Sequence, residues 1–244
     1  MKRLNPYAED ELHVWRISLE VPPGRLTALA ATLSPVEQKR AECFGSELLR
    51  RRYTAGHGAL REILSRYAGR APEALRFGKR PDGKPELLDP PGWRFGFSHS
   101  LDLALCGVTR RHEVGVDLEA LRPLSDPLDL AERFFAPDEA ATLRRLPETS
   151  RQAAFFRCWT RKEAILKATG EGLLGSLRDF SVSLEAAELP RLLRMKDDDP
   201  GEWELYSFEP APAFAAAVAV RARGLRLVHR VWEPAAAPEE RPGP

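Results

Sequence analysis

The spacing of apolar and polar residues along this chain predicts a mixture of strands and helices. Alternating patterns rich in β-branched and aromatic residues predict strands at 12–21, 94–109, 113–121, 180–184, 203–208, 214–220 and 225–232, the second of them split in two around 98–100. Helical spacing predicts a helix over 46–67 and a shorter one that begins at the capping box Ser34-Pro35-Val36-Glu37. Three more helical segments follow from Leu128, interrupted at Pro137 and Pro147. The proline- and glycine-rich stretch 69–93 predicts a loop or wide turn.

The last helical segment carries the most unusual pattern of charges. It contains the sequence WTRKEAILKATGEGL at 159–173, and its apolar residues form one broad arc of a helix. Glu163 and Lys167 lie at the edge of that arc, spaced so that a carboxylate and an ammonium can meet on one face. Lys162 falls inside the arc, where a lysine must extend its stem to solvent or meet an anion. Gly170 and Gly172 are predicted to end the helix.

A second acidic pattern lies in the predicted strand EVGVDLEAL at 113–121. Alternation places Gly115, Asp117 and Glu119 on one face of the strand, with two carboxylates side by side. Such carboxylates raise each other's pKa unless a cation compensates them. Alternating acids on an exposed edge strand are the plainer alternative.

Asp117 and Glu119, together with Glu163, offer three carboxylates and no histidine or cysteine nearby in sequence. Ligands made only of oxygen favour a hard cation such as Mg²⁺, which completes its shell with waters and substrate phosphates. This predicts a phosphorylated substrate, whose remaining phosphates would meet basic residues of the first half of the chain. Those residues are Lys39, Arg40, Arg52, Lys84 and His99.

A faint internal repeat predicts two similar halves. Three short motifs recur after about a hundred residues: 17–20 resembles 116–119, 34–37 resembles 136–139, and 61–64 resembles 162–165. We expect an α+β fold with an N-terminal lobe at 1–110, a C-terminal lobe at 111–234 and a ligand-binding cleft between them. The proline-rich segment 235–244 is predicted to be a disordered tail.

Composition narrows the class of protein. The chain has 244 residues and a formal net charge of +1, which gives no global attraction to nucleic acid or acidic membranes. Its three cysteines are far apart and suggest neither a disulfide framework nor a zinc site. The N-terminus lacks the apolar segment of a secretory signal, and the longest apolar run, 214–220, is too short to span a bilayer. These features predict a soluble cytoplasmic protein.

The two acidic patterns also carry a resemblance to a known family. GVDLE and WTRKEAILK, about forty residues apart, resemble the signature motifs of the 4′-phosphopantetheinyl transferases, G-[IV]-D-[IVL]-E and [FW]-x-x-K-E-[AS]-x-x-K. Phe97-Ser98-His99-Ser100 is similar to the serine–histidine stretch upstream of the first motif, and Lys84-Pro85 to the family's glycine–lysine–proline. The length and the repeat resemble the monomeric, two-lobed kind, like the surfactin-synthetase activators. The resemblance covers roughly residues 34–173.

The resemblance implies an enzyme that transfers the phosphopantetheine arm of coenzyme A to a serine of an apo acyl, peptidyl or polyketide carrier protein, releasing 3′,5′-ADP. Asp117, Glu119 and Glu163 would hold Mg²⁺, or alternatively Mn²⁺, against the pyrophosphate. Asp117, Glu163 and Lys167 would be the catalytic residues. Glu163 would take the proton of the serine, directly or through a water, and Lys167 would bind phosphate and stabilise the leaving group.

The resemblance also implies how coenzyme A is held. Arg52 and His99 would bind the 3′-phosphate, which places the nucleotide on the N-terminal lobe, and Lys84 and Ser98 would contact nearby groups. Lys162 is a further candidate for phosphate contact. For carrier docking, the sequence suggests apolar side chains around Phe134 and Phe135, flanked by Arg133, Arg144 and Arg145.

Two other functions fit part of the pattern. A Mg²⁺-dependent phosphohydrolase or nuclease would also use clustered carboxylates beside basic residues, but it would need no carrier protein. A nucleic-acid-binding module could use the basic band at 50–52, although the near-neutral net charge weighs against it.

Overall fold

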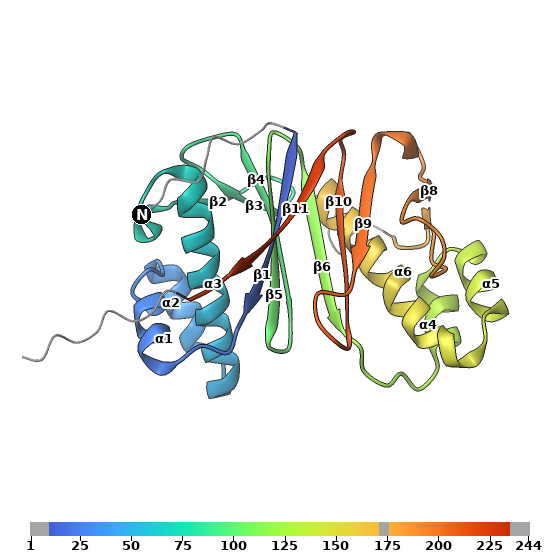
Figure 1. Cartoon of the computed structure of the whole chain (residues 1–244), viewed down its shortest axis with the longest axis horizontal. Coiled ribbons are helices and arrows are strands. Elements are labelled where there is room, and N and C mark those ends of the chain that lie inside the picture. Colours follow the sequence, from blue (N-terminus) through green and yellow to red (C-terminus); the bar gives the residue numbers. More distant parts are fainter. Residues whose placement is uncertain (1–9, 171–175, 235–244) are drawn as a thin grey trace, which may run out of the picture.

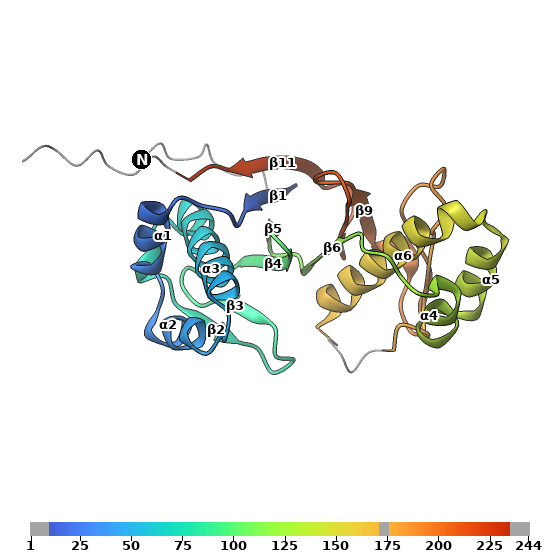
Figure 2. The same cartoon turned by 90° about the horizontal axis from the view of Figure 1, so that it is seen from below.

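The structure is a computed structural model that describes residues 10–170 and 176–234. Two β-sheets lie side by side at the centre of the molecule, and helices cover the outer face of each (Figures 1 and 2). The predicted tail at 235–244 and the helix-ending Gly172 lie outside the described residues.

The first half of the chain forms one sheet and its helices. Its elements are β1 (Glu11–Ser18), α1 (Pro23–Ala30), α2 (Pro35–Glu42), α3 (Glu47–Ala68), η1 (Pro72–Ala74), β2 (Phe77–Lys79), β3 (Pro85–Leu87), β4 (Trp93–Ser100) and β5 (Leu103–Arg110). The second half contains β6 (Val114–Ala120), α4 (Pro127–Phe134), α5 (Pro137–Arg145), α6 (Glu148–Thr169), β7 (Ser181–Val182), β8 (Leu192–Arg194), η3 (Pro200–Glu202), β9 (Glu204–Phe208), β10 (Phe214–Val220) and β11 (Arg226–Trp232).

The two halves follow a similar plan. The first sheet has the strand order β11-β1-β5-β4 and the second β6-β10-β9. Each lies against one long helix of 22 residues, α3 or α6, and each helix ends at a glycine in the left-handed conformation, Gly69 or Gly170. This arrangement confirms the predicted α+β class and the two similar halves.

Strand β11 departs from the predicted division of the chain. The predicted C-terminal lobe includes 225–232, whereas β11 pairs in parallel with β1 in the first sheet, Glu11 opposite Arg226 and Ile17 opposite Trp232. Pairing between strands so distant in sequence depends on the finished sheet and leaves no local signal. The chain therefore crosses between the lobes twice.

Three apolar cores hold these layers together. One lies between α3 and the first sheet, and another between α6 and the second sheet. The third lies between the two sheets and includes Val114, Val116 and Leu118 of β6, the face that the alternation predicted to be apolar. The opposite face of β6 is thereby turned toward α6.

Two local predictions are wrong in detail. The stretch 69–93 contains a short hairpin, because β2 pairs with β3 around the turn at 80–84. Residues 98–100 belong to the end of β4, and the turn into β5 falls at Leu101, whose φ is +52°. Strand β8 is too short to have given a periodic signal.

Within the described residues, no helix is both long and apolar enough to cross a membrane.

Buried His13 on β1 makes the fold sensitive to acid. Its Nε2 lies 2.8 Å from Glu11 Oε2, and its Nδ1 accepts from Arg230 Nε at 3.0 Å. Burial, and then the charge of Arg230, lower the pKa of His13 from 6.5 to about 4. Because this pKa is lower in the folded state, the associated stability is present above pH 6.5 and is lost as the pH falls through 4.

We therefore expect this histidine to contribute a loss of up to about 3 kcal/mol in unfolding free energy between neutral pH and pH 4. Urea denaturation at several pH values would measure the loss, and His13→Asn should have a shallower pH dependence than the wild type. Equal slopes in the two proteins would contradict the assignment.

Candidate active site

Strand β6 and helix α6 contact each other through their backbones at Gly115. A Cβ built on this glycine would lie 1.9 Å from the carbonyl oxygen of Ala164 and 2.5 Å from the amide nitrogen of Ala168. Only a residue without a side chain permits this approach. This close approach places Asp117, two residues further along β6, next to the charged side chains of α6.

Asp117 and Lys167 form the centre of the site. Lys167 Nζ donates to Asp117 Oδ1 at 2.5 Å, and Ser98 Oγ lies 3.3 Å from the same oxygen. Asp117 is buried, and burial raises the pKa of its carboxyl although Lys167 acts against the shift. Its other oxygen, Oδ2, is buried and has no hydrogen-bond partner in the described structure. Such an orphaned acceptor calls for a cation or a donor.

Glu119 and Glu163 lie within electrostatic range of Asp117. Burial raises the pKa of both glutamates, and the charge of Asp117 raises both further. Glu119 adds to the shift of Glu163. The structure thus gathers the three predicted carboxylates around one region. Burial is the main reason that their pKa values are raised, and repulsion between like charges adds to the shift at Glu119 and Glu163.

These residues fit a hard divalent cation in their chemistry. The donors are all carboxylate oxygens, one of them is orphaned, and their mutual repulsion would be relieved by a positive ion. In the part of the chain that the structure describes, no three His, Cys, Asp or Glu side chains already stand in a metal-binding arrangement. Lys167 supplies a positive charge beside Asp117, and Arg122 supplies another at 3.5 Å from Glu119.

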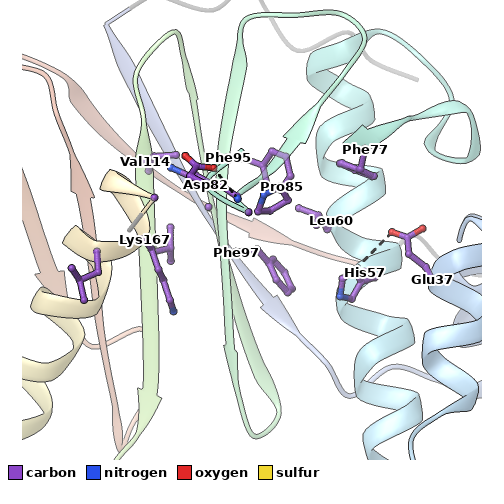
Figure 3. Close-up of a pocket in the computed structure, with 16 residues that line it drawn as sticks. Glu37, His57, Leu60, Phe77, Asp82, Pro85, Phe95, Phe97, Val114 and Lys167 are labelled. Carbon is purple, nitrogen blue, oxygen red and sulfur yellow. Dashed lines mark hydrogen bonds and ion pairs between the residues drawn. The ribbon is translucent and has the colours of Figure 1, made fainter. Parts of the chain in front are cut away.

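A cavity of about 440 Å³ lies between the lobes beside this cluster. Figure 3 shows Lys167 from α6 and His57 from α3 on opposite sides of it, with Phe97 between them. Most of the lining is apolar, from Leu60, Phe77, Pro85, Phe95, Phe97, Val114, Val116 and Leu166. A mostly apolar lining with a few polar and charged groups is typical of a small-molecule site.

A second, more cationic cavity of about 280 Å³ shares His57 and Phe97 with the first. Arg52 and His99, predicted to bind the same phosphate, both line it. Arg52 Nε is buried and has no hydrogen-bond partner in the described structure. Desolvation, and then the charges of His57 and Lys167, lower the pKa of His99. An anion would satisfy the free donor and favour a protonated His99.

Lys162, in contrast, has no access to a phosphate. Its side chain is 0% exposed, and its ammonium donates to both carboxylate oxygens of Glu139, at 2.8 and 2.6 Å, and to the carbonyl of Phe180 at 2.5 Å. The helical wheel correctly placed this lysine in the apolar arc, but the anion that it meets is a side chain of α5. The predicted phosphate contact is wrong.

Ser98 and Lys84 have partners in the structure that the sequence did not indicate, and their contacts with coenzyme A stay predictions. Ser98 lies beside Asp117 and Lys167 and not with the residues of the second cavity. Lys84 lines the first cavity, but its ammonium is bound to Glu113 at 2.9 Å and to the carbonyl of Ala168 at 3.3 Å.

The suggested docking surface is only partly available. Phe135 is 0% exposed and stacks on Phe155, so it cannot meet a partner, while Phe134 is 39% exposed and lies edge-on to Trp159. Arg144 is paired with Glu132.

Sequence reasoning missed His57, which lines both cavities. Its ring stacks on Tyr53 with 4.0 Å between centroids, and its Nδ1 lies 3.8 Å from Glu37 Oε1. A signal was present, because Tyr53 and His57 are spaced i, i+4 on the helix that carries Arg52.

Together, Asp117, the two half-buried glutamates, Lys167 and the adjoining cationic cavity form a site at the junction of two α+β lobes whose chemistry suits a phosphorylated small molecule. Comparison with known proteins agrees. The model of the 4′-phosphopantetheinyl transferase superfamily matches residues 113–219. The chain is 43% identical over 228 residues to the 4′-phosphopantetheinyl transferase HetI of Nostoc sp. strain PCC 7120, covering 92% of this chain and 91% of that protein.

Other relatives carry the same description. The chain is 33% identical to the 4′-phosphopantetheinyl transferase psf-1 of Bacillus pumilus, over 70% of this chain and 72% of that one, and 28% identical to Sfp of Bacillus subtilis, over 76% and 81%. A crystal structure of a holo-(acyl-carrier-protein) synthase from Bacillus anthracis in complex with CoA (3′,5′-ADP) is 26% identical, covers 44% of this chain and 93% of that one, and has a TM-score of 0.36. The chain belongs to the 4′-phosphopantetheinyl transferase superfamily, as its two motifs indicated.

Proposed function

We propose that this protein is a 4′-phosphopantetheinyl transferase that moves the phosphopantetheine arm of coenzyme A onto a serine of an apo carrier protein and releases 3′,5′-ADP. The observation that carries the proposal is the close grouping of Ser98, Asp117 and Lys167 beside the interlobe cavity, in a member of this superfamily. A phosphohydrolase would not need Lys167 or a carrier surface, and no relative named above is described as one.

The reaction exchanges one phosphorus–oxygen bond for another. The serine oxygen attacks the pyrophosphate phosphorus that bears the pantetheine arm, and the bond from that phosphorus to the oxygen shared with the adenosine phosphate breaks. That oxygen leaves with 3′,5′-ADP, and the serine proton passes to a base. Such a transfer depends mainly on positioning and on neutralising charge.

Glu163 is the proposed base. Its carboxyl has a raised pKa, caused by burial and by the charges of Asp117 and Glu119, and a raised pKa makes a carboxylate a better proton acceptor. Lys167 would neutralise charge on the pyrophosphate during bond cleavage, because its ammonium is held beside the cavity by Asp117.

Mg²⁺ would be held by Asp117, Glu119 and Glu163, with Mn²⁺ as the alternative ion. When bound, this ion would supply charge neutralisation to the pyrophosphate oxygens. Asp117 Oδ2 is the best-prepared donor, since it is buried without a partner in the described structure.

The nucleotide end of coenzyme A would lie against the N-terminal lobe. We assign its 3′-phosphate to Arg52 and His99 in the second cavity, where a free buried donor is present. We further propose a monomeric, cytoplasmic enzyme with no nucleic-acid or membrane partner. Cys43, Cys106 and Cys158 are all free thiols, as expected in a reducing compartment.

Metal binding should depend on pH in a definite direction. The pKa values of Glu119 and Glu163 are higher in the folded, metal-free protein than in the unfolded chain. The stability that these two groups contribute is therefore fully present below their unfolded pKa, and it is lost as the pH rises through their folded pKa. Mg²⁺ binds the deprotonated forms. We therefore expect the increase in Tm caused by Mg²⁺ to be near zero at pH 4.5 and to grow to several degrees at pH 7.5, corresponding to about 2 kcal/mol at saturating ion.

Thermal unfolding with and without Mg²⁺ at both pH values would measure this effect, and Glu163→Gln should reduce it. An increase in Tm of the same size at both pH values would contradict the assignment of the ion to these carboxylates.

The function is tested by incubating an apo carrier protein with the chain, coenzyme A and Mg²⁺ and measuring its intact mass. We expect a gain of one phosphopantetheinyl group that chelator abolishes. If several acyl, peptidyl and polyketide carriers remained unmodified, the proposal would be wrong.

A further inference from the structure

Glu113, the residue before strand β6, collects three cations from the N-terminal lobe. Lys84 Nζ lies 2.9 Å from its Oε2 and Arg94 Nε 2.7 Å from its Oε1, and Arg80 is also bound to Oε1. Arg80 and Lys84 belong to the turn at 80–84 between β2 and β3, and Arg94 belongs to β4. One carboxylate therefore fixes this turn to the start of the strand that carries Asp117.

The same turn is attached to the end of α6. Lys84 donates to the carbonyl of Ala168 at 3.3 Å, one of the last-turn carbonyls that have no partner within a helix. Asp82 packs against the glycine that ends α6, since a Cβ on Gly170 would lie 2.4 Å from Asp82 Oδ2. The turn thus bridges the beginning of β6 and the end of α6.

This turn is also a wall of the interlobe cavity. Asp82, Gly83, Lys84 and Pro85 line it together with Lys167 and Gly170. Lys84 is 9% exposed at its side chain. Without Glu113, its ammonium would face the guanidinium groups of Arg80 and Arg94 with fewer negative charges, those of Asp82 and Glu86, to compensate them. Like charges so placed would separate, and the wall would move with them.

We propose that Glu113 is a positioning residue of the coenzyme A site, which holds the turn at 80–84 against α6 so that Lys84 and the cavity wall are in place before the nucleotide binds. This inference rests on the proposed function. We assign Glu113 no contact with a reacting group, since it acts through Lys84. A site ordered in advance binds more tightly because less ordering is required on binding.

The test is steady-state transfer to an apo carrier protein, together with calorimetric binding of 3′,5′-ADP. Glu113→Gln should raise the KM for coenzyme A and the Kd of 3′,5′-ADP about tenfold, while kcat stays within about twofold, because the groups around Asp117 are unchanged. Glu73→Gln is the matched control. It removes an exposed carboxylate from η1 of the same lobe, one with no ion pair among the described residues, and should leave both constants unchanged.

A double-mutant cycle separates positioning from a general loss of stability. If Glu113 acts through Lys84, the variant with both Glu113→Gln and Lys84→Met should bind 3′,5′-ADP no more weakly than Lys84→Met alone. Unchanged KM and Kd in Glu113→Gln, or additive losses in the double variant, would overturn the inference. A wild-type protein that neither binds 3′,5′-ADP nor modifies a carrier would instead reject the proposed function.

Discussion

Glu163→Gln should lower kcat for carrier modification by about 10²- to 10⁴-fold. Glutamine has the shape of glutamate but cannot accept the serine proton, and it removes one of the negative charges around Asp117 that favour a divalent cation. Intact mass of an apo carrier protein at timed intervals would measure the rate. The loss should be far larger than any change in the binding of 3′,5′-ADP, whose 3′-phosphate we place at Arg52 and His99.

The appropriate control is Glu148→Gln in the first turn of the same helix. That glutamate is exposed and lies far from the cluster along α6, so its substitution should leave the rate within about twofold of wild type. If Glu163→Gln retained a tenth or more of the wild-type kcat, another group would have to be the base, and Glu163 would be limited to binding.

The centre of this site was predictable because local periodicity determines it. The two-residue period of a β-strand predicted that Asp117 and Glu119 lie on the face of β6 opposite Val116 and Leu118. The structure has that arrangement. The helical period likewise placed Lys167 at the edge of the apolar arc of α6, from where it reaches Asp117. Neither inference needed to know which distant segment lay nearby.

The wrong prediction for the site concerns a charged side chain for which the sequence allowed more than one partner. From the sequence, Lys162 had to extend its stem to solvent or meet an anion, and both a substrate phosphate and Glu139 fit the second case. Only the packing of α5 against α6 decided in favour of Glu139. Lys84 likewise has a partner that the sequence did not indicate, Glu113, 29 residues away, and its predicted contact with coenzyme A stays a prediction.

Topology was the other source of error. Strand β11 alternates like the strands before it, so its composition did not reveal that it returns to β1. One edge of β1 is paired with β5, so the other edge of β1 is free to pair in parallel with β11. Edge availability is a property of the assembled sheet, which periodicity along the chain cannot describe.

Gly115→Ala should destabilise the fold by more than about 3 kcal/mol, at the upper end of what overpacking costs. The new methyl group would lie 1.9 Å from the carbonyl oxygen of Ala164. This atom belongs to the backbone of α6, so no side-chain rotation relieves the clash and the helix must move away from β6. Urea denaturation would measure the loss, and Gly24→Ala, where nothing lies within 4 Å of the added Cβ, should be within about 0.5 kcal/mol of wild type.

The same substitution should also affect the site before the protein unfolds. Moving α6 away from β6 separates Lys167 Nζ from Asp117 Oδ1, which are 2.5 Å apart only because the two backbones touch at Gly115. At a temperature where Gly115→Ala is still folded, its transfer rate should be at least tenfold below that of Gly24→Ala, because catalysis depends on sub-ångström placement of these groups. Wild-type stability and rate in Gly115→Ala would show that the helix can shift without cost, and that the close approach does not position the catalytic residues.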